Sequence, residues 1–198
     1  MAEFVLPKSF FDENPLREIS AAKLADFRMD MAGSLELSSV TGEILSPHMP
    51  QKRLEAQAED RAAIAALETP ADVLNYMRHP HDAFLDGEFY QKVRTLPEDV
   101  YPAIVDRFKR SALDRFIEHT AVILFYADPK YTARLLAEYD QIRNPYAKST
   151  ACLLFGKLGF QDAAPLLLQE YRRFRRDYPK DSFDQGPLLG LSHLFPEN

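Results

Sequence analysis

Apolar residues recur at spacings of three and four positions through most of the chain after residue 50, which is the period of an amphipathic helix. From about residue 98 onward the predicted helices come in pairs, covering residues 98–110 with 112–128, 129–140 with 144–159, and 161–176 with 184–195. The aromatic residues that close the first helix of each pair, Phe108, Tyr139 and Tyr171, stand 31 and 32 positions apart. A period near this length with two helices per unit is typical of an α-solenoid, so the pattern predicts an all-α fold of stacked helix pairs.

Four of the predicted helix starts share the same residue types. Asp99, Asp162 and Asp184 each stand three residues before a proline, and Asp128 stands directly before one. An aspartate at the N-cap accepts a backbone N–H that has no partner within the helix. A proline in the first turn sacrifices no hydrogen bond, because the N–H that it lacks would be unpaired there. We therefore predict that these four aspartates cap helices.

Upstream of residue 98 the pattern is less regular. Thr69 as N-cap and Pro70 in the first turn predict a short helix over 69–80, and helices are also predicted over 14–31, 50–68 and 86–96. Residues 34–46 alternate apolar and polar positions around Thr41 and Gly42, which predicts a hairpin or an extended arm. We therefore expect two parts: an irregular, acidic amino-terminal region over 1–50 and a helical repeat domain over 51–198.

Two glycines stand between strongly apolar runs in LLFGKLGFQDAAPLLLQEY, residues 153–171. Gly156 falls inside a predicted helix, where a missing side chain lets a second helix approach closely. Gly159 falls where that helix stops, which is the usual place for a left-handed C-terminal cap. The stretch is therefore predicted to join two stacked helices.

Within this stretch, LFGKLGFQDAAPLLL resembles the HEAT-like repeats of the phycobilisome-lyase type, whose units carry an LG-x-LG pattern followed by A-x-P-L-L. The resemblance covers about residues 151–168. It implies an α-α superhelix, in the form of a short HEAT-like solenoid, and a tendency to bind partners. It implies no enzymatic activity.

The composition is that of a folded globular protein with an uneven charge. The chain has 198 residues, of which 46% are hydrophobic and 27% are charged, which excludes overall disorder. The net charge is −6: residues 1–99 hold 10 Lys and Arg against 18 Asp and Glu (−8), and residues 100–198 hold 14 against 12 (+2). A negative net charge disfavours non-specific binding to phosphate backbones. The asymmetry suggests different roles for the two halves.

Membrane, secretion and cofactor signals are missing from the sequence. No apolar run reaches the roughly 18–20 residues that a transmembrane helix needs, and the first residues lack the basic leader and apolar centre of a signal peptide. Cys152 is the single cysteine, so no internal disulfide forms. Glycine-rich phosphate loops, a nucleophile elbow and a His-Glu-x-x-His motif are also missing. We therefore expect a cytoplasmic protein with no cofactor and no membrane partner.

Two imidazoles and a carboxylate stand close together in RHPHDAF, where His79, His81 and Asp82 fall within four positions. These residue types ligate zinc, but a zinc site needs three or four ligands that converge from fixed elements. The motif has no cysteine or third histidine near it, and the remaining histidines are scattered along the chain: His48, His119 and His193. We therefore expect a polar loop at a helix end, with no bound metal.

The neighbouring residues Glu118 and His119 lie on the second helix of their pair. A carboxylate beside an imidazole suits acid–base catalysis, but adjacent residues on a helix do not face one another. We therefore expect no catalytic role for them. Second helices line the concave face of HEAT-like stacks, so Arg115 and His119 are predicted to contact a partner there.

The sharpest charge feature is YRRFRRDYPK, residues 171–180, in which arginines flank an aromatic stripe. Guanidinium groups beside aromatic faces suit phosphate or nucleic acid. In a chain of net charge −6, however, a docking site for an acidic partner is the favoured interpretation, with Arg172, Arg173 and Arg176 as contact residues. A nucleic-acid site would need these arginines to form one row with a second set, Lys109, Arg143 and Lys148.

The last predicted helix carries more apolar residues than one buried stripe requires: Leu188, Leu189, Leu191, Leu194 and Phe195. The amino-terminal FVLPKSFF, a second copy of the chain or another protein is expected to cover them. The leading expectation is a non-catalytic scaffold or adaptor that binds another protein. The alternatives are a nucleic-acid-binding protein that uses residues 172–176 and an enzyme with a pocket between the amino-terminal region and the solenoid.

Overall fold

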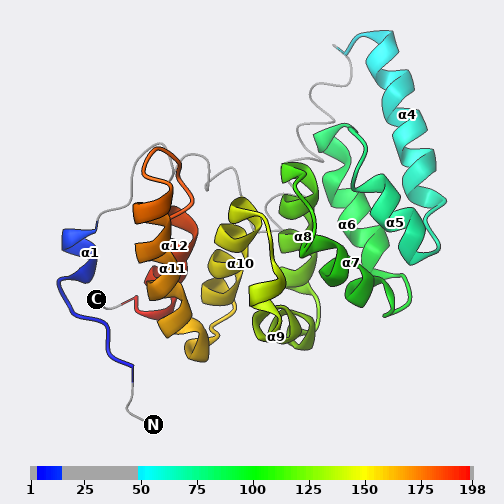
Figure 1. Cartoon of the computed structure of the whole chain (residues 1–198). Helices are drawn as coiled ribbons and strands as arrows, with labels where there is room; N and C mark the ends of the chain where they lie inside the picture. Colours follow the sequence, from blue (N-terminus) through cyan, green and yellow to red (C-terminus); the bar gives the residue numbers. More distant parts are fainter. Residues whose placement is uncertain (1–3, 15–48, 197–198) are drawn as a thin grey trace.

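The computed structural model describes residues 4–14 and 49–196, and within these ranges every regular element is a helix (Figure 1). The α-helices are α1 (Phe10–Glu13), α4 (Gln51–Ala65), α5 (Pro70–Tyr76), α6 (Asp86–Arg94), α7 (Val100–Phe108), α8 (Asp114–Tyr126), α9 (Pro129–Ala137), α10 (Pro145–Lys157), α11 (Ala164–Asp177) and α12 (Gln185–Leu194). Single 3₁₀ turns, η2 (Ala83–Leu85), η3 (Tyr139–Gln141) and η4 (Gln161–Ala163), occupy three of the connections.

The all-α prediction is confirmed for the described residues. Each helix predicted after residue 50 is present, with ends that differ by a few residues from the sequence pattern. The helix predicted over 14–31 and the hairpin predicted over 34–46 fall outside the described residues, apart from residue 14. None of the helices that the structure describes is long and apolar enough to cross a bilayer.

The helix starts follow the sequence prediction only in part. The Asp128 carboxylate accepts the N–H of Lys130 at 2.9 Å, as predicted. Asp99 and Asp184 occupy the N-cap positions of α7 and α12 without a side-chain capping bond, and Asp162 lies within η4. A capping aspartate needs an extended backbone to bring its carboxylate over the first N–H groups, whereas Asp99 and Asp184 already have helical backbone angles. The prediction of capping was therefore wrong at these three positions.

From α4 onward the helices follow one another in sequence order across the molecule, and α1 lies beside α11 and α12 at the far end (Figure 1). Most helices pack on others that are near them in sequence: α5 on α7, α7 on α8, α8 on α9 and α10, and α10 on α12. One apolar core runs along the whole row. The largest fully buried aromatic side chains come from α6, α7, α8, α10 and α11: Phe89, Phe108, Phe116, Phe155 and Phe174.

The joint between α10 and α12 is the closest helix contact of this end of the row. A Cβ added to Gly156 would lie 2.2 Å from the backbone oxygen of Gly190, and one added to Gly186 would lie 2.1 Å from that of Ser149. The predicted close approach at Gly156 is confirmed, because only residues without side chains let the two backbones come this near. Gly159 ends the helix with a φ of +74°, which confirms the predicted left-handed cap.

The amino-terminal segment, residues 4–14, lies against α11 and the end of α12. Leu6 and Phe10 are buried, and Phe10 makes an edge contact with the ring of Tyr171 at 5.6 Å between ring centres. Phe4 lies 6.0 Å from the ring of Phe195, just after α12. FVLPKSFF therefore supplies part of the cover that the apolar last helix was expected to need.

Candidate functional site

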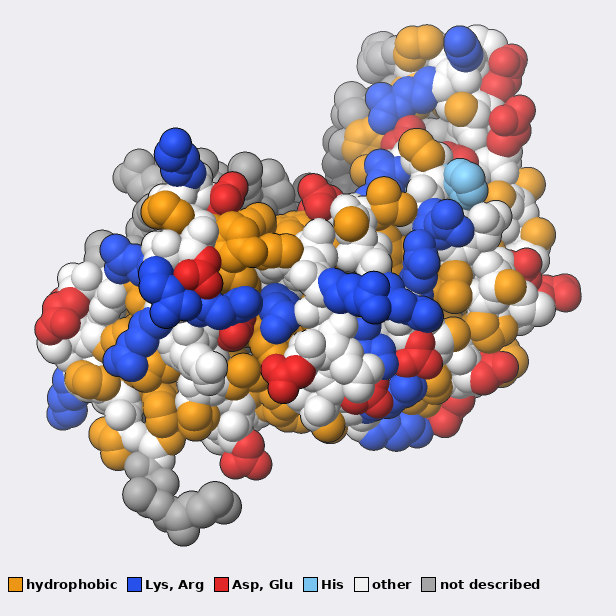
Figure 2. Space-filling model, in the orientation of Figure 1, with side chains coloured by type: hydrophobic (Ala, Val, Ile, Leu, Met, Phe, Trp, Pro, Cys, Tyr) orange, Lys and Arg blue, Asp and Glu red, His pale blue; other side chains and the backbone are white. Residues whose placement is uncertain are grey.

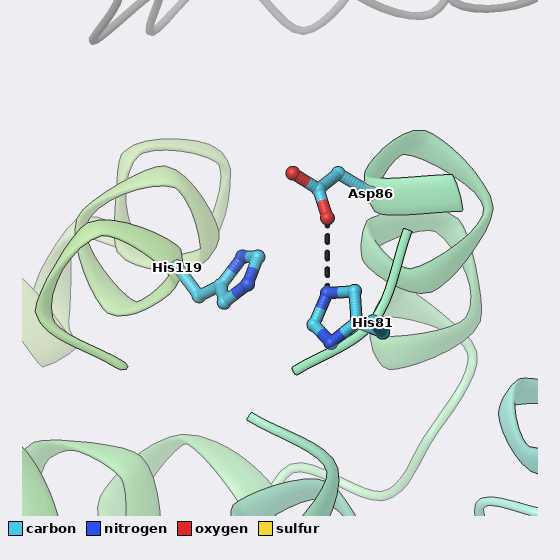
Figure 3. A group of neighbouring side chains, drawn as sticks. All are labelled: His81, Asp86 and His119. Atoms are coloured by element: carbon cyan, nitrogen blue, oxygen red, sulfur yellow. Dashed lines mark hydrogen bonds and ion pairs between the residues drawn. The ribbon is translucent and has the colours of Figure 1, made fainter. Parts of the chain in front are cut away.

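Three potential metal ligands, two of them close in sequence and the third far from both, gather between α6 and α8 (Figure 3). His81 lies in the loop after α5, Asp86 is the first residue of α6, and His119 lies in the middle of α8. Each offers one ligating atom, and these atoms all lie within 4.8 Å of one another. The fold thus builds a cluster of two imidazoles and one carboxylate.

The ring of His81 is held on several sides. Its Nε2 lies 3.0 Å from Oδ1 of Asp86, and its Nδ1 lies 3.1 Å from the backbone oxygen of His79. The ring stacks on Tyr76 at 4.4 Å between ring centres, and the side chain is only 2% exposed. Arg115 on α8 donates to the backbone oxygen of His81 at 3.3 Å, which ties the loop to the neighbouring helix. The imidazole therefore has one well-defined position.

His119 is buried, and one of its ring nitrogens lacks a partner. Nδ1 lies 2.7 Å from the hydroxyl of Tyr90 on α6, whereas the buried Nε2 has no hydrogen-bond partner among the described residues. The ring stacks on that of His81 at 5.1 Å. Burial lowers the pKa of His119 to about 4, so the imidazole is neutral at neutral pH. A neutral imidazole bound through Nδ1–H has a lone pair on Nε2.

Glu118, the sequence neighbour of His119, has a different hydrogen-bond partner. Glu118 accepts a hydrogen bond from the hydroxyl of Tyr146 on α10 at 2.8 Å, and burial raises its pKa. Because consecutive helix residues diverge, Glu118 and His119 contact different helices, α10 and α6, and do not form a pair. This geometry agrees with the expectation that the two do not act together in acid–base catalysis.

The polar residues of the RHPHDAF motif have different roles: one joins the cluster and the others do not. His79 is exposed, and its Nε2 lies 3.2 Å from the Asn75 side chain. Asp82 accepts hydrogen bonds from Arg53 and Gln57 of α4, both at 2.9 Å. Burial raises the pKa of Asp82, but these hydrogen bonds outweigh that effect and lower it to about 2. Asp82 therefore fastens α4 to the loop, and only His81 of the motif joins the cluster.

The sequence predicted that no third ligand lies near the RHPHDAF motif, and the fold shows that this prediction was wrong. His119 lies far from His81 along the chain, and α8 places it beside the loop. Asp86 was not singled out, since it is one of several acidic residues at helix starts. The only sequence signal was a histidine among apolar neighbours on α8, in FIEHTAVIL.

The residues predicted to touch a partner on the second helices have other roles. His119 is 4% exposed, so it cannot contact a partner surface, and that prediction was wrong. Its sequence neighbour Glu118 is charged, but the packing of α6 on α8 encloses the imidazole of His119 itself. Arg115 is partly buried and holds the loop at His79 and His81 through their backbone oxygens.

The arginines of α11 form a second candidate site. Figure 2 shows Lys and Arg side chains gathered on α11 and continuing across the same face toward the middle of the molecule. Two hollows of about 520 and 340 Å³ lie between α11 and the amino-terminal segment. Arg172 and Arg176 line both hollows, Arg175 lines the larger and Arg173 the smaller.

The four arginines differ in how far they are already paired. Arg173 forms an ion pair with the buried Glu170, and Arg176 pairs with Asp177 at 2.7 Å. Arg175 donates to the hydroxyl of Tyr171 and to the side chain of Asn14. Arg172 is exposed and has no ion pair or hydrogen bond with another described residue.

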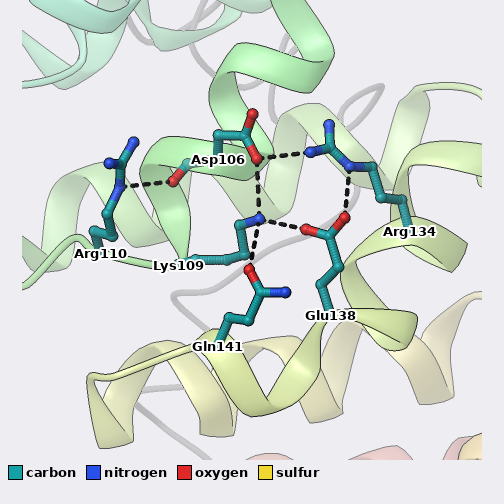
Figure 4. Close-up of polar contacts among 6 residues, drawn as sticks. All are labelled: Asp106, Lys109, Arg110, Arg134, Glu138 and Gln141. Carbon is teal, nitrogen blue, oxygen red and sulfur yellow. Dashed lines mark hydrogen bonds and ion pairs between the residues drawn. The ribbon is translucent and has the colours of Figure 1, made fainter.

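Lys109, from the second set of cations, is neutralised inside a polar network (Figure 4). Its ammonium group pairs with Asp106 at 2.9 Å and with Glu138, and it donates to Gln141 at 3.2 Å. Arg134 bridges the same two carboxylates at 2.7 and 3.0 Å. Lys109 is 8% exposed, so it cannot reach a phosphate on the surface.

Comparisons with protein-family models, with curated proteins and with solved structures give no match to this chain. The resemblance of residues 151–168 to HEAT-like repeats therefore stays a prediction from the sequence. Functional proposals for this protein rest on the geometry of its own residues.

Proposed function

We propose that this protein is a non-catalytic scaffold, a short HEAT-like solenoid, that binds an acidic segment of another protein at its α11 end. The observation that carries this proposal is the pair of adjoining hollows lined by Arg172, Arg173, Arg175 and Arg176. Guanidinium groups bind carboxylates through paired, charge-assisted hydrogen bonds. The exposed Arg172, which faces both hollows, is the first anchor for such a partner.

The surroundings of these arginines favour a preformed site. Tyr171 and Phe174 of α11 are buried in the core, and Arg173 lies over the ring of Phe174 at 4.8 Å. The amino-terminal segment closes one side through the hydrogen bond of Asn14 with Tyr171. A site whose side chains are already ordered loses less conformational entropy when it binds.

The nucleic-acid alternative is weakened by ion pairing. Its row of cations required Lys109, which is enclosed with Asp106 and Glu138. Arg173 is likewise paired with Glu170. A cation that already has a carboxylate partner gains less from a phosphate, so the row of cations that a nucleic acid would need lacks Lys109.

The enzyme alternative placed a pocket between the amino-terminal region and the helices, and the two hollows do lie beside residues 4–14. Among the described residues that line them, Glu13 is the single carboxylate, and there is no histidine or cysteine. This composition suits binding of an anion more than general acid–base chemistry. Self-association through α12 is not part of the proposal, because Leu188, Leu191 and Leu194 are buried within the chain.

Fluorescence anisotropy with a labelled glutamate-rich peptide tests the proposal. A peptide with glutamine in place of glutamate and a short DNA duplex serve as competing probes. We expect Arg172→Glu to weaken binding of the acidic peptide by about tenfold or more, because an attractive charge becomes repulsive. Lys52→Glu, an equal change of charge on the exposed surface of α4, should leave the affinity within about twofold.

Three results would contradict the proposal. The first is equal affinity of the wild-type protein for the glutamate and the glutamine peptide. The second is a loss of affinity in Lys52→Glu as large as that in Arg172→Glu. The third is tighter binding of the DNA duplex than of the acidic peptide. The last result would establish the nucleic-acid alternative instead.

A further inference from the structure

Independently of partner binding at α11, we propose that His81, Asp86 and His119 bind one divalent transition-metal ion of the zinc type. The three ligands come from the loop after α5, the start of α6 and the middle of α8 (Figure 3). The site would join two neighbouring helices through metal–ligand bonds. The proposal rests on the ligand set, on the partners of each ring and on one buried nitrogen.

The ligand atoms are already near the spacing that a metal requires. Bonds of about 2.0–2.1 Å in a tetrahedral site place neighbouring ligand atoms about 3.4 Å apart. The ligating atoms of the three residues lie within 4.8 Å of one another, and Nε2 of His81 is 3.0 Å from Asp86. Shifts of about an ångström would close the set around an ion, which side-chain rotation alone can supply.

Both imidazoles are held by the partners that metal-binding histidines usually have. A ligating histidine donates its other ring N–H to a carbonyl, carboxylate or hydroxyl oxygen, which fixes the ring and its tautomer. Nδ1 of His81 has the backbone oxygen of His79 as its partner, and Nδ1 of His119 has the hydroxyl of Tyr90. With Nδ1 of each ring as the donor in these contacts, each Nε2 is the nitrogen that can donate a lone pair to a metal.

Nε2 of His119 is the observation that points to a ligand. It is buried, and it has no hydrogen-bond partner among the described residues, although native proteins pair nearly all such atoms. The centre of its ring lies 5.1 Å from that of His81, so the two imidazoles are direct neighbours. A metal ion between the three residues would satisfy this nitrogen.

The donor types select the class of metal. Two imidazole nitrogens and one carboxylate suit Zn²⁺ and its neighbours in the first transition row, whereas Ca²⁺ and Mg²⁺ require mostly oxygen ligands. Three protein ligands leave one or more coordination positions for water or another small ligand. The Asp86 side chain is 32% exposed, so solvent reaches this side of the cluster.

An ion pair between His81 and Asp86 is the simplest competing explanation. It accounts for the 3.0 Å contact and for the bond of His81 to the His79 carbonyl, since a protonated imidazole donates from both nitrogens. It does not account for His119, whose Nε2 would remain buried and unpaired. The two explanations therefore predict different behaviour of His119.

The test is a titration of the untagged, full-length chain with Zn²⁺ after treatment with a chelator. Isothermal titration calorimetry should show one Zn²⁺ per chain, and Co²⁺ used as a probe should give visible absorption bands of a bound ion. We expect His119→Ala and Asp86→Asn each to lower the Zn²⁺ affinity by about a hundredfold or more. Removal of an exposed histidine outside the cluster, in His193→Ala, should leave the affinity within about twofold.

NMR of the imidazole nitrogens in the wild-type protein tests whether His81 and His119 bind the metal, even if a variant fails to fold. Addition of Zn²⁺ should change the nitrogen chemical shifts of Nε2 in His81 and Nε2 in His119. The nitrogen chemical shifts of His79 and His193 should stay unchanged. Absence of stoichiometric binding, an equal loss of affinity in the His193→Ala control, or a shift confined to His81 would overturn the proposal. The first of these outcomes, no stoichiometric binding of Zn²⁺, is the one that a His81–Asp86 ion pair without a metal predicts.

Discussion

Two helix joints of this molecule show opposite ways to bury a contact. Between α10 and α12, glycines let backbones meet, and the buried polar groups are paired: the Ser149 hydroxyl donates to the backbone oxygen of Phe183 at 2.7 Å. Between α6 and α8, large rings fill the space, and the contact includes His81, Tyr90 and His119. The first joint is held by close packing, and the second by polar aromatic side chains.

The difference lies in the polar atoms that stay unpaired. Nε2 of His119 and the hydroxyl of Tyr76, whose ring stacks on His81, are two of the three buried side-chain atoms without a hydrogen-bond partner among the described residues. Each such atom costs about 1–3 kcal/mol relative to a paired one. Packing alone does not require that cost, as the α10–α12 joint demonstrates. The α6–α8 joint is therefore the place to look for function.

The largest effect is expected at the close-packed joint. Gly156→Ala would place a methyl group 2.2 Å from the Gly190 backbone oxygen, which forces α10 and α12 apart. We expect a loss of about 3 kcal/mol or more in the free energy of unfolding, measured by urea denaturation. Gly159→Ala, in open space but at a φ of +74°, should cost only about 1–2 kcal/mol from backbone strain. Equal losses would show that the close contact is not what the joint depends on.

At the polar joint, Tyr90→Phe tests the partner of the proposed ligand. The change removes the hydroxyl that lies 2.7 Å from Nδ1 of His119, so the ring loses its fixed orientation and tautomer. The Zn²⁺ affinity should fall by about 10- to 100-fold, as measured by calorimetry. Tyr101→Phe on α7, whose hydroxyl has no hydrogen bond with another described residue, is the matched control and should retain wild-type affinity. Unchanged affinity in Tyr90→Phe would remove Tyr90 from the metal site.

A double variant asks whether the polar joint contributes to stability without metal. Tyr90→Phe with His119→Leu replaces both partners of the buried hydrogen bond by apolar side chains. In a chelator, its free energy of unfolding should stay within about 1 kcal/mol of wild type, because no new unpaired group remains. Zn²⁺ should raise the melting temperature of the wild-type protein only. A large loss of stability in chelator would mean that the histidine is an ordinary structural residue.

The smallest effect on stability is expected at the polar network around Lys109. Hydrogen bonds from Lys109 lower the pKa of Asp106 and Glu138 from their ordinary values of 3.8 and 4.5. The network therefore stabilises the fold above these values, and this contribution is lost as the pH falls through and below them. Lys109→Met should flatten the loss of stability between about pH 5 and 3 in urea denaturation. The change should be modest, since Asp106 is 45% exposed, and an identical acid profile in Lys109→Met would contradict it.

Local features of the fold were predictable from the sequence because they depend on residues within one or two helical turns. The three- and four-residue spacing located the helices after residue 50, and Thr69 forms the capping bonds that its position predicts. Gly159 has the left-handed conformation expected of a helix end. The close approach at Gly156 was also predicted, although its partner Gly190 was not.

The candidate sites were decided by the tertiary structure. His119 meets His81 only because α8 packs beside the loop after α5, and no local pattern relates two positions so far apart. The partner of Lys109 was also decided by packing, because Glu138 belongs to a different helix pair. Phe4 likewise contacts Phe195 from the other end of the chain.

The sequence by itself determined which segments become helices and which side of each is apolar, because helix formation depends on neighbours along the chain. The packing of those helices decided which polar side chains become buried and which residues they meet. Such contacts depend on the positions of whole elements, so the metal-ligand cluster and the arginine-lined hollows emerge only when the row of helices is assembled.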